Sequence, residues 1–325
     1  MTTLVCVDVG TTNTRVWLVG GGRILARRAA PVGARDTARD GHDRALREGL
    51  RHLIAGVLGD RPADVGAPRC IAAAGMITSP QGLVEVPHVV APAGLEQLGA
   101  GAQERVVSDV SDLPFLFVPG VRTVALPGAP SGIGASDVMR GEETLCLGLL
   151  RQGRIAAGGA VLNVGSHWKL IRIDEQGRVA WSVTSLAGEM VQAVRGETIL
   201  ASALPAGPLA DPDGPRLLEG LREARRSGLA RALFCVRLLH LSGTTTPEER
   251  MSFLLGAFIG ADLERLQTTG SLPAGTPVAV TGGEKAGGAW TIALDQAGCP
   301  AQNISAADVE SAFVGGLQAI VEAHR

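Results

Sequence analysis

Near the start of the chain, a carboxylate is followed at once by a glycine and a row of small polar residues, in the segment "CVDVGTTNTR" (6–15). The apolar run that ends at Asp8 and the apolar run after the turn are typical of two strands of a hairpin. Backbone N–H groups in such a turn point outward together, and small side chains let a phosphate group approach them. A polar hairpin with an incidental acid would give the same pattern. The turn is predicted to bind phosphate through Gly10, Thr11, Thr12, Asn13 and Arg15.

The Asp8 carboxylate would lie close to the oxygens of a phosphate bound in this turn. Two anions repel each other unless a cation lies between them. Mg²⁺ is commonly held by one or two carboxylates together with water and the phosphates of the substrate. Asp8 is therefore predicted to hold Mg²⁺ rather than to act as a base.

A second turn of the same form occurs in the other half of the chain, in "NVGSHWK" (163–169). It offers backbone N–H groups, a hydroxyl and a cation from Gly165, Ser166, His167 and Lys169. His167 is expected to order the turn rather than to catalyse. Two such turns in matching positions favour phosphate binding over two coincidental hairpins.

A third glycine-rich segment, "VTGGEKAGG" (280–288), follows an apolar run that predicts a buried strand. Paired glycines at a strand end allow a flat ring or a phosphate to approach the backbone. The segment lacks the G-K-[ST] ending of a Walker A loop and the G-x-G-x-x-G pattern of a dinucleotide fold. Gly282 and Gly283 are thus candidate nucleotide contacts, and Lys285 could either touch the ligand or be solvated.

Hydrophobic periodicity predicts the elements that position these turns. Residues 3–9, 14–19 and 23–29 indicate an antiparallel meander, and residues 160–183 repeat that arrangement. Two similar α/β halves are therefore expected. Further buried strands are predicted over 69–75, 115–121 and the start of 276–290, and a loop or linker over 126–137. Helices are predicted over 42–58, 141–153, 189–203, 215–240 in pieces, 248–268, the end of 276–290, and 308–323.

The composition excludes several classes of protein. A net charge of −2, no tyrosine and 3% aromatic residues argue against a nucleic-acid partner. The five cysteines form no C-x-x-C pair, and no apolar run reaches the length of a membrane span. The chain opens on a strand pattern, so no signal peptide is expected. A cytoplasmic protein without a membrane partner is predicted, and a homodimer is possible.

Together the three glycine-rich segments resemble the phosphate-1, phosphate-2 and adenosine segments of the sugar kinase, Hsp70 and actin superfamily. A narrower resemblance, to the 2-dehydro-3-deoxygalactonokinase family, rests on "AAAGMI" (72–77), "VPGV" (118–121), "DVMRGEETLCLG" (137–148) and "GSHWKLI" (165–171). It extends from about residue 4 to the C-terminal helix, and "DVMRGEET" is its most specific part. The resemblance implies two duplicated ribonuclease-H-like (actin-like ATPase) domains that close on ATP from both sides of an interdomain cleft.

The implied reaction is the ATP-dependent phosphorylation of a sugar-acid hydroxyl, namely the C6 hydroxyl of 2-dehydro-3-deoxy-D-galactonate. Kinases of the superfamily place an Asp at the start of the helix that precedes the second phosphate turn. Here "RGEET" occupies that position, so Glu142 is the first candidate for the base and Asp137 the second. Acids in the first turn of a helix also suit its dipole, and a purely structural role would give the same residues.

An acidic substrate requires a cation or N–H donors for its carboxylate, and Arg binds carboxylates through two parallel hydrogen bonds. Arg140 is the favoured candidate, although a salt bridge to a neighbouring acid would also explain it; Arg15, Arg195 and Arg237 are the alternatives. Strand-end position and the resemblance together predict a sugar pocket formed by Gly75, Met76, Pro119, Gly120 and Glu189.

Two domains are predicted on this basis. Residues 1–133 would bind phosphate and sugar, and residues 134–325 would carry the second phosphate turn and the adenosine segment, with the C-terminal helix packed back on the first domain. Two other functions fit the same fold: a kinase for another sugar acid or small acceptor, such as pantothenate, and a non-catalytic nucleotide-sensing regulator. The "DVMRGEET" segment favours the sugar-acid kinase, and no DNA-binding module is expected ahead of the first strand.

Overall fold

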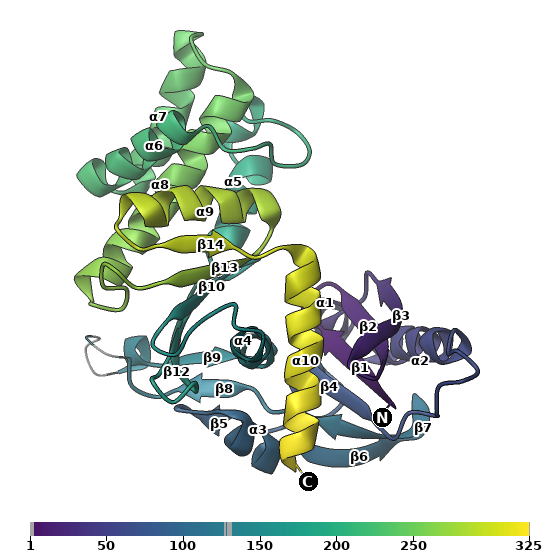
Figure 1. Cartoon of the computed structure of the whole chain (residues 1–325). Helices are drawn as coiled ribbons and strands as arrows, with labels where there is room; N and C mark the ends of the chain where they lie inside the picture. Colours follow the sequence, from purple (N-terminus) through teal and green to yellow (C-terminus); the bar gives the residue numbers. More distant parts are fainter. Residues whose placement is uncertain (1–2, 127, 129–131, 325) are drawn as a thin grey trace.

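The computed structural model describes residues 3–126, 128 and 132–324, and within them two sheets form the framework of the molecule (Figure 1). The first sheet has the strand order β3 (Arg23–Ala30), β2 (Thr14–Gly20), β1 (Thr3–Val9), β4 (Ile71–Gly75), β7 (Ser111–Phe117) and β6 (Gln103–Val107). The second has the order β12 (Val179–Ser185), β11 (Trp168–Ile173), β10 (Ala160–Val164), β13 (Val278–Gly282) and β14 (Ala301–Asn303).

Both sheets repeat one topology. In each, an antiparallel meander comes first, and its first strand then pairs in parallel with a later strand: β1 with β4, and β10 with β13. A further parallel strand follows outward, β7 in the first sheet and β14 in the second. The duplication of α/β halves expected from the sequence is confirmed.

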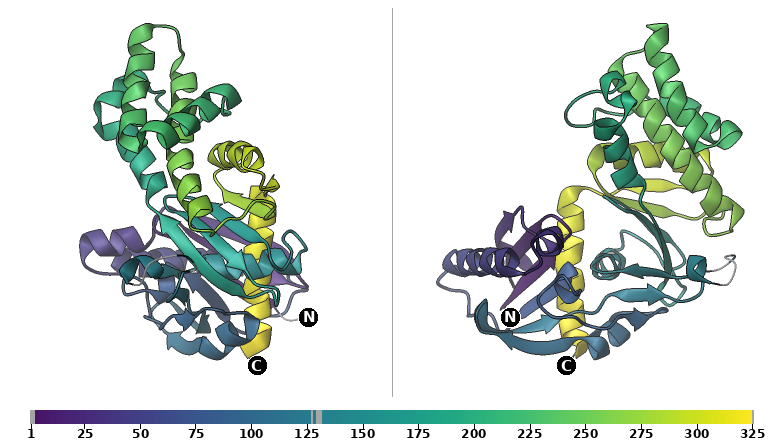
Figure 2. Two further views of the ribbon diagram at one scale, coloured as in Figure 1. Left: turned by 90° about the vertical axis from the view of Figure 1, so that its left-hand side faces the viewer. Right: turned by 180° about the vertical axis from the view of Figure 1, so that it is seen from behind.

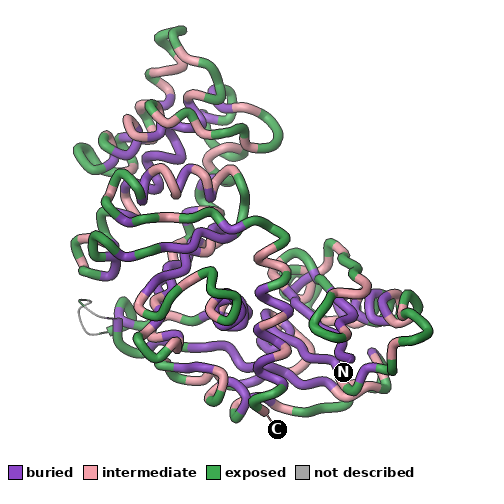
Figure 3. The backbone as a smooth tube through the Cα atoms, in the orientation of Figure 1, coloured by how far each residue is buried: buried purple, intermediate pink, exposed green. Residues whose placement is uncertain are grey.

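The central strand of each sheet is buried on both faces, as parallel pairing requires. In β1, Leu4 and Cys6 belong to one hydrophobic cluster, while Val5 and Val7 belong to another on the opposite face. In Figure 3 the chain is coloured as buried along β1, and every residue of this strand is buried. The strand ends, where the polar turns begin, are therefore held by a rigid framework.

Helices cover both sheets. Those of the first half are α1 (Ala34–Asp40), α2 (Arg44–Gly59) and α3 (Leu95–Gly101). In the second half, α6, α7 and α8 form the part of the molecule farthest from the first sheet (Figures 1 and 2). The helices of that half are α4 (Glu142–Arg151), α5 (Ala187–Glu197), α6 (Gly214–Ser227), α7 (Leu229–Ser242), α8 (Pro247–Thr268), α9 (Glu284–Gln296) and α10 (Ala306–His324).

The C-terminal helix α10 stands between the first sheet and α4, as the views of Figures 1 and 2 show. It shares a hydrophobic cluster with residues of β1, β4 and α4. The Trp17 Nε1–H of β2 donates a 2.6 Å hydrogen bond to Glu310 Oε1 of α10. This helix thus links the two ends of the chain.

The segment between the halves differs in part from the sequence prediction. The strand expected over 115–121 is wrong in its bounds: β7 ends at Phe117, and residues 121–123 form β8. β8 lies between β5 (Val89–Val90) and β9 (Asp137–Met139) in a small separate sheet.

The loop expected over 126–137 includes residues 127 and 129–131, which lie outside the described residues. Its described part contains a 3₁₀ turn at Ile133–Ala135. β8 and β9 pair with each other although they lie on opposite sides of the predicted domain boundary at 133/134. The boundary itself stays a prediction.

The other predicted elements agree with the structure within a few residues, except that the helix expected over 189–203 is α5 followed by a 3₁₀ turn at Ile199–Ala203. α1, α3 and β6 carried no recognised pattern. No helix in the described part of the chain is long and apolar enough to cross a membrane.

Candidate functional site

The first polar turn lies between β1 and β2 and is closed by a hydrogen bond from the Gly10 N–H to the Asn13 carbonyl, 2.8 Å long. Thr12 and Asn13 are exposed, and the Asn13 side-chain amide donates to Thr12 Oγ1 at 3.0 Å. Behind the turn, the Ala34 N–H donates to the Gly10 carbonyl at 3.1 Å. The turn is thus fixed from the protein side and open toward solvent.

The second turn, between β10 and β11, has an equivalent arrangement. The Glu189 N–H of α5 donates to the Ser166 carbonyl at 2.8 Å, and Gly165 and Ser166 are exposed. His167 Nε2 lies 3.3 Å from Glu189 Oε1, so the imidazole links the turn to the helix. Glu189, predicted to contact sugar, therefore lies at the second phosphate turn.

A glycine brings a helix against the backbone of each turn. A Cβ on Gly33, directly before α1, would lie 2.6 Å from the Gly10 carbonyl oxygen. A Cβ on Gly188 in α5 would overlap the Gly165 carbonyl oxygen in the same way. The N-terminus of α5 carries the positive end of a helix dipole, which favours an anion at this turn. The two glycines are a second mark of the duplication, and the sequence patterns did not single out Gly33.

The glycines at the ends of the parallel strands form a third matching pair. A Cβ on Gly75 would lie 2.5 Å from the Val9 carbonyl oxygen and 3.0 Å from Asp8 Oδ1. Gly282 approaches the Val164 carbonyl even more closely, and the Gly283 N–H donates to that carbonyl at 3.1 Å. Both strand ends therefore keep side chains away from the turn beside them.

Lys285 lies at the start of α9, one turn beyond these glycines. Its ammonium pairs with the exposed carboxylate of Asp211 at 2.6 Å. The lysine is thus engaged in a surface ion pair. Its predicted nucleotide contact stays a prediction.

Asp8 is buried at the end of β1, and its Oδ2 accepts a 2.6 Å hydrogen bond from the half-exposed Arg15 guanidinium. Burial raises the pKa of Asp8 above its usual range, against the opposing effect of Arg15; the charge of Glu142 raises the pKa further. Oδ1, in contrast, faces the bare backbone of Gly75 and Gly141. One oxygen of this carboxylate is therefore held by Arg15, and the other accepts no hydrogen bond from the described residues.

The N-terminus of α4 approaches Asp8 across the junction of the two halves. A Cβ on Gly141, whose φ is +103°, would lie 3.3 Å from Gly75 Cα and 3.9 Å from Asp8 Oδ1. This close approach carries Glu142, the next residue, into the electrostatic range of Asp8. The first phosphate turn and the segment "RGEET" thus form one site.

Both carboxylate oxygens of Glu142 have partners. Oε1 lies 3.0 Å from Lys169 Nζ, and Oε2 accepts a 3.2 Å hydrogen bond from the Arg140 N–H. Lys169 is buried and also donates to the Val138 carbonyl at 3.1 Å. The lysine predicted to contact nucleotide is therefore directed at the candidate base, and it orients that carboxylate.

Asp137, the second candidate for the base, faces β12 instead. Its Oδ2 accepts hydrogen bonds from Ser182 Oγ at 2.6 Å and from Thr184 Oγ1 at 2.9 Å. Glu142 is one of the charges that act on Asp8, and Asp137 is not among them. Proximity to Asp8, rather than a free carboxylate oxygen, therefore favours Glu142 over Asp137 as the candidate base.

Glu143 is fully buried beside Glu142, and both of its oxygens accept from the Gly141 N–H at 2.8 and 2.9 Å. Burial, aided by the charge of Glu142, raises the pKa of Glu143 to about 7. The side chain fixes the peptide that faces Gly75 and Asp8. A helix-terminus acid was expected here, but not its full burial.

Arg140 extends away from Glu142 toward the first half. Its guanidinium donates to Thr78 Oγ1 at 2.8 Å and to the Val86 carbonyl at 2.9 Å, and lies 3.4 Å from His88 Nδ1. Within the described residues no carboxylate lies within 4.0 Å of this guanidinium, so the predicted alternative of a salt bridge is wrong. Its positive charge is available to an acidic ligand.

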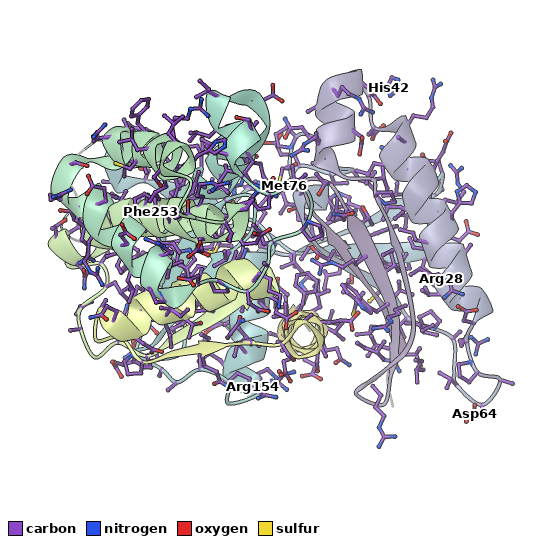
Figure 4. The ribbon with its side chains drawn as sticks, turned by 90° about the horizontal axis from the view of Figure 1, so that it is seen from above. Arg28, His42, Asp64, Met76, Arg154 and Phe253 are labelled. Carbon is purple, nitrogen blue, oxygen red and sulfur yellow. The ribbon has the colours of Figure 1, made fainter. Side chains whose placement is uncertain are left out.

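The remaining predicted residues lie around this group or elsewhere. Met76 begins a 3₁₀ turn after Gly75 and lies near the junction of the two halves, as Figure 4 shows from above. Gly120 lies directly under Arg140 and His88, whereas Pro119 packs toward Gly101 of α3.

Arg195 donates to the carbonyls of residues 205 and 207, and Arg237 lies beside His240. Those two arginines thus have local partners.

Known proteins that resemble this chain in sequence or in fold include two that bear the same enzyme name. A curated 2-dehydro-3-deoxygalactonokinase from Escherichia coli K12 is 26% identical over 334 residues, which cover 98% of this chain and 97% of the relative. A crystal structure from Sinorhizobium meliloti, assigned to the same enzyme, has a TM-score of 0.77 at 25% identity and 98% coverage of both chains. An activator of 2-hydroxyisocaproyl-CoA dehydratase from Clostridium difficile, solved with bound ADPNP, shares the fold alone, with a TM-score of 0.52, 10% identity, and coverage of 99% and 96%.

The sequence pattern of the 2-keto-3-deoxy-galactonokinase family matches residues 8–320, from Asp8 near the end of β1 to the last turns of α10. This range contains both phosphate turns and the "RGEET" segment. The chain therefore belongs to the 2-keto-3-deoxy-galactonokinase family.

Proposed function

We propose that this protein is a kinase that transfers the γ-phosphoryl group of ATP to the C6 hydroxyl of 2-dehydro-3-deoxy-D-galactonate. The observation that carries the proposal is the approach of Gly141 to Gly75 and Asp8, which joins Glu142 to the first phosphate turn. The family membership supports the same conclusion, because the match extends across both halves.

The proposed roles follow from the contacts. The two turns would hold the phosphates from opposite halves through backbone N–H groups and hydroxyls, and Gly282 and Gly283 would leave room for the nucleoside. The sugar C6 oxygen would attack the γ-phosphorus as its proton passes to Glu142, and the bond to the β-phosphate oxygen would break to release ADP. Lys169 keeps Glu142 oriented for this step.

The Asp8 carboxylate suits Mg²⁺, because Oδ2 is held by Arg15 while Oδ1 lies beside the side-chain-free backbone of Gly75 and Gly141 and accepts no hydrogen bond from the described residues. The described residues contain no group of three or more His, Cys, Asp or Glu side chains that could hold a metal by themselves. Asp8 would therefore share the ion with water and the phosphates of ATP. When bound, Mg²⁺ would neutralise charge on the phosphates during transfer.

Arg140 would bind the substrate carboxylate, and Gly75, Met76 and Gly120 would line the sugar pocket. We place the enzyme in the cytoplasm, without nucleic-acid or membrane partners. The buried Cys6 and Cys146 thiols and the net charge of −2 are consistent with this placement.

The test is ADP release from ATP and Mg²⁺ with a panel of 2-keto-3-deoxy sugar acids, each epimer assayed separately. The galacto epimer should give the highest kcat/KM, and ³¹P–¹H correlation of the product should place the phosphate on C6. Preference for another acceptor would indicate a kinase of different specificity. A protein that binds ATP but releases no ADP with any acceptor would be a nucleotide-sensing regulator.

A further inference from the structure

His88 lies in the loop before β5, next to Arg140, and no sequence motif includes it. Its Nδ1 lies 3.4 Å from Arg140 Nη2. An arginine can only donate hydrogen bonds, so Nδ1 must be the acceptor of this pair. The proton of a neutral His88 ring is then on Nε2, which has no hydrogen-bond partner among the described residues.

Burial and the surrounding charges keep the His88 ring neutral. Burial is the largest cause, and Arg140 before α4, Arg122 on β8 and Lys169 on β11 add to it by opposing a further positive charge. Together they lower the pKa of His88 to about 4. At neutral pH the ring therefore offers a single uncharged donor, Nε2–H, beside the Arg140 guanidinium, which has no carboxylate within 4.0 Å among the described residues.

The backbone of Gly120 fixes where both side chains lie. A Cβ at this position would lie 2.6 Å from Arg140 Cγ and 2.9 Å from His88 Cδ2. Any side chain at residue 120 would displace one or both of these groups. The positions of the two donors are thus set by packing as well as by their mutual contact.

We propose that His88 is a specificity-determining residue that donates its Nε2–H to the C2 keto oxygen of the acceptor, while Arg140 binds the adjacent C1 carboxylate. A keto oxygen is an uncharged acceptor and suits an uncharged donor, whereas a carboxylate suits a guanidinium. The pair would therefore recognise 2-keto acids as a class. The inference deepens the proposed kinase function and rests on it.

Two variants separate the roles of the ring nitrogens. In His88→Asn, the amide oxygen can replace Nδ1 as the acceptor for Arg140, but the distal donor is lost. In His88→Gln, the longer side chain places an N–H near the position of Nε2. The measurements are KM and kcat with 2-dehydro-3-deoxy-D-galactonate and with its C2-reduced 2-hydroxy analogue, together with the KM for ATP and the melting temperature.

We expect wild-type enzyme to prefer the keto acid, and His88→Asn to lose about tenfold or more of that preference, chiefly through KM. The KM for ATP should stay unchanged, and His88→Gln should retain part of the preference. Equal losses on both acceptors, or no loss, would overturn the proposal.

A binding experiment keeps this test separate from the proposed activity. In ¹⁵N spectra of labelled protein, His88 should be the neutral Nε2–H tautomer at pH 7, and pyruvate should shift Nε2 more than lactate does. That result would support the 2-keto subsite even if the galacto acceptor gave no turnover. A different tautomer, or equal shifts with both acids, would contradict the subsite even in an active kinase.

Discussion

The Lys169 ammonium lies 3.0 Å from the Glu142 carboxylate and thereby connects the meander of the second half to the N-terminus of α4. Because Gly141 touches Gly75, the same contact is linked to the first phosphate turn and to Asp8. The site is therefore assembled from β1, α4 and β11 together. Four predictions follow from its geometry.

Substitution of the candidate base, Glu142→Gln, should lower kcat by about 100-fold or more, the usual size of a general-base contribution. Binding of ATP, measured by calorimetry, should change little, because the side chain contacts Lys169 and the Arg140 N–H rather than a phosphate turn. Asp137→Asn is the matched control and should retain most of the activity. If Asp137→Asn is inactive and Glu142→Gln is not, the base is Asp137.

Asp8→Asn should abolish most turnover while the fold persists. The amide oxygen can still accept the hydrogen bond from Arg15, and the loss of a buried charge removes a desolvation cost. We therefore expect a melting temperature equal to or above that of the wild type, with ADP release reduced by about two orders of magnitude. Normal turnover in this variant would exclude a metal-binding role for Asp8.

Two glycines of α5 offer a matched pair. A Cβ at Gly188 would overlap the carbonyl of Gly165, whereas a Cβ at Gly196 would meet nothing within 4 Å. Gly188→Ala should weaken ATP binding and destabilise the protein, because the second turn must move away from the helix. Gly196→Ala should leave ATP binding unchanged and raise the free energy of unfolding by up to about 1 kcal/mol through helix propensity. Identical behaviour of the two variants would show that the close packing is unimportant.

Glu143 should make stability dependent on pH. Its pKa is raised to about 7 in the folded protein, from an ordinary value of 4.5, so the folded state binds more protons between these values. The free energy of unfolding should consequently fall as pH rises from about 4.5 to 7, by up to about 3 kcal/mol from this group. Urea unfolding at pH 5 and pH 8 should show a smaller difference for Glu143→Gln than for the wild type. An unchanged difference would contradict the assignment.

The sequence predicted the parts of the site that are local in the chain. Each polar turn is a short run of small residues between two apolar runs, and each meander is a series of apolar runs separated by short turns, so both features are visible within a few neighbouring residues. Glu142 was found through its place in "RGEET". Such features depend on backbone geometry that local residue types largely determine.

The missing parts depend on contacts between distant segments. Arg140 and His88 are separated by 52 positions, and the loop that carries His88 shows no periodicity. Lys169 was expected to contact nucleotide with the rest of the second turn, but in the structure it pairs with Glu142 and donates to the Val138 carbonyl. The packing of β9 and α4 against β11 determines these partners of Lys169, and the packing of the loop before β5 determines the partner of Arg140.

Helix α10 has a consequence for how the chain folds. The hydrogen bond between Trp17 and Glu310 closes a loop of 293 residues, and the helix covers part of one face of β1 and β4. Until α10 docks, the first sheet must carry uncovered apolar surface, and such long-range contacts form slowly. The first sheet, although it is synthesised first, would therefore complete its core only after the last helix of the chain has been made.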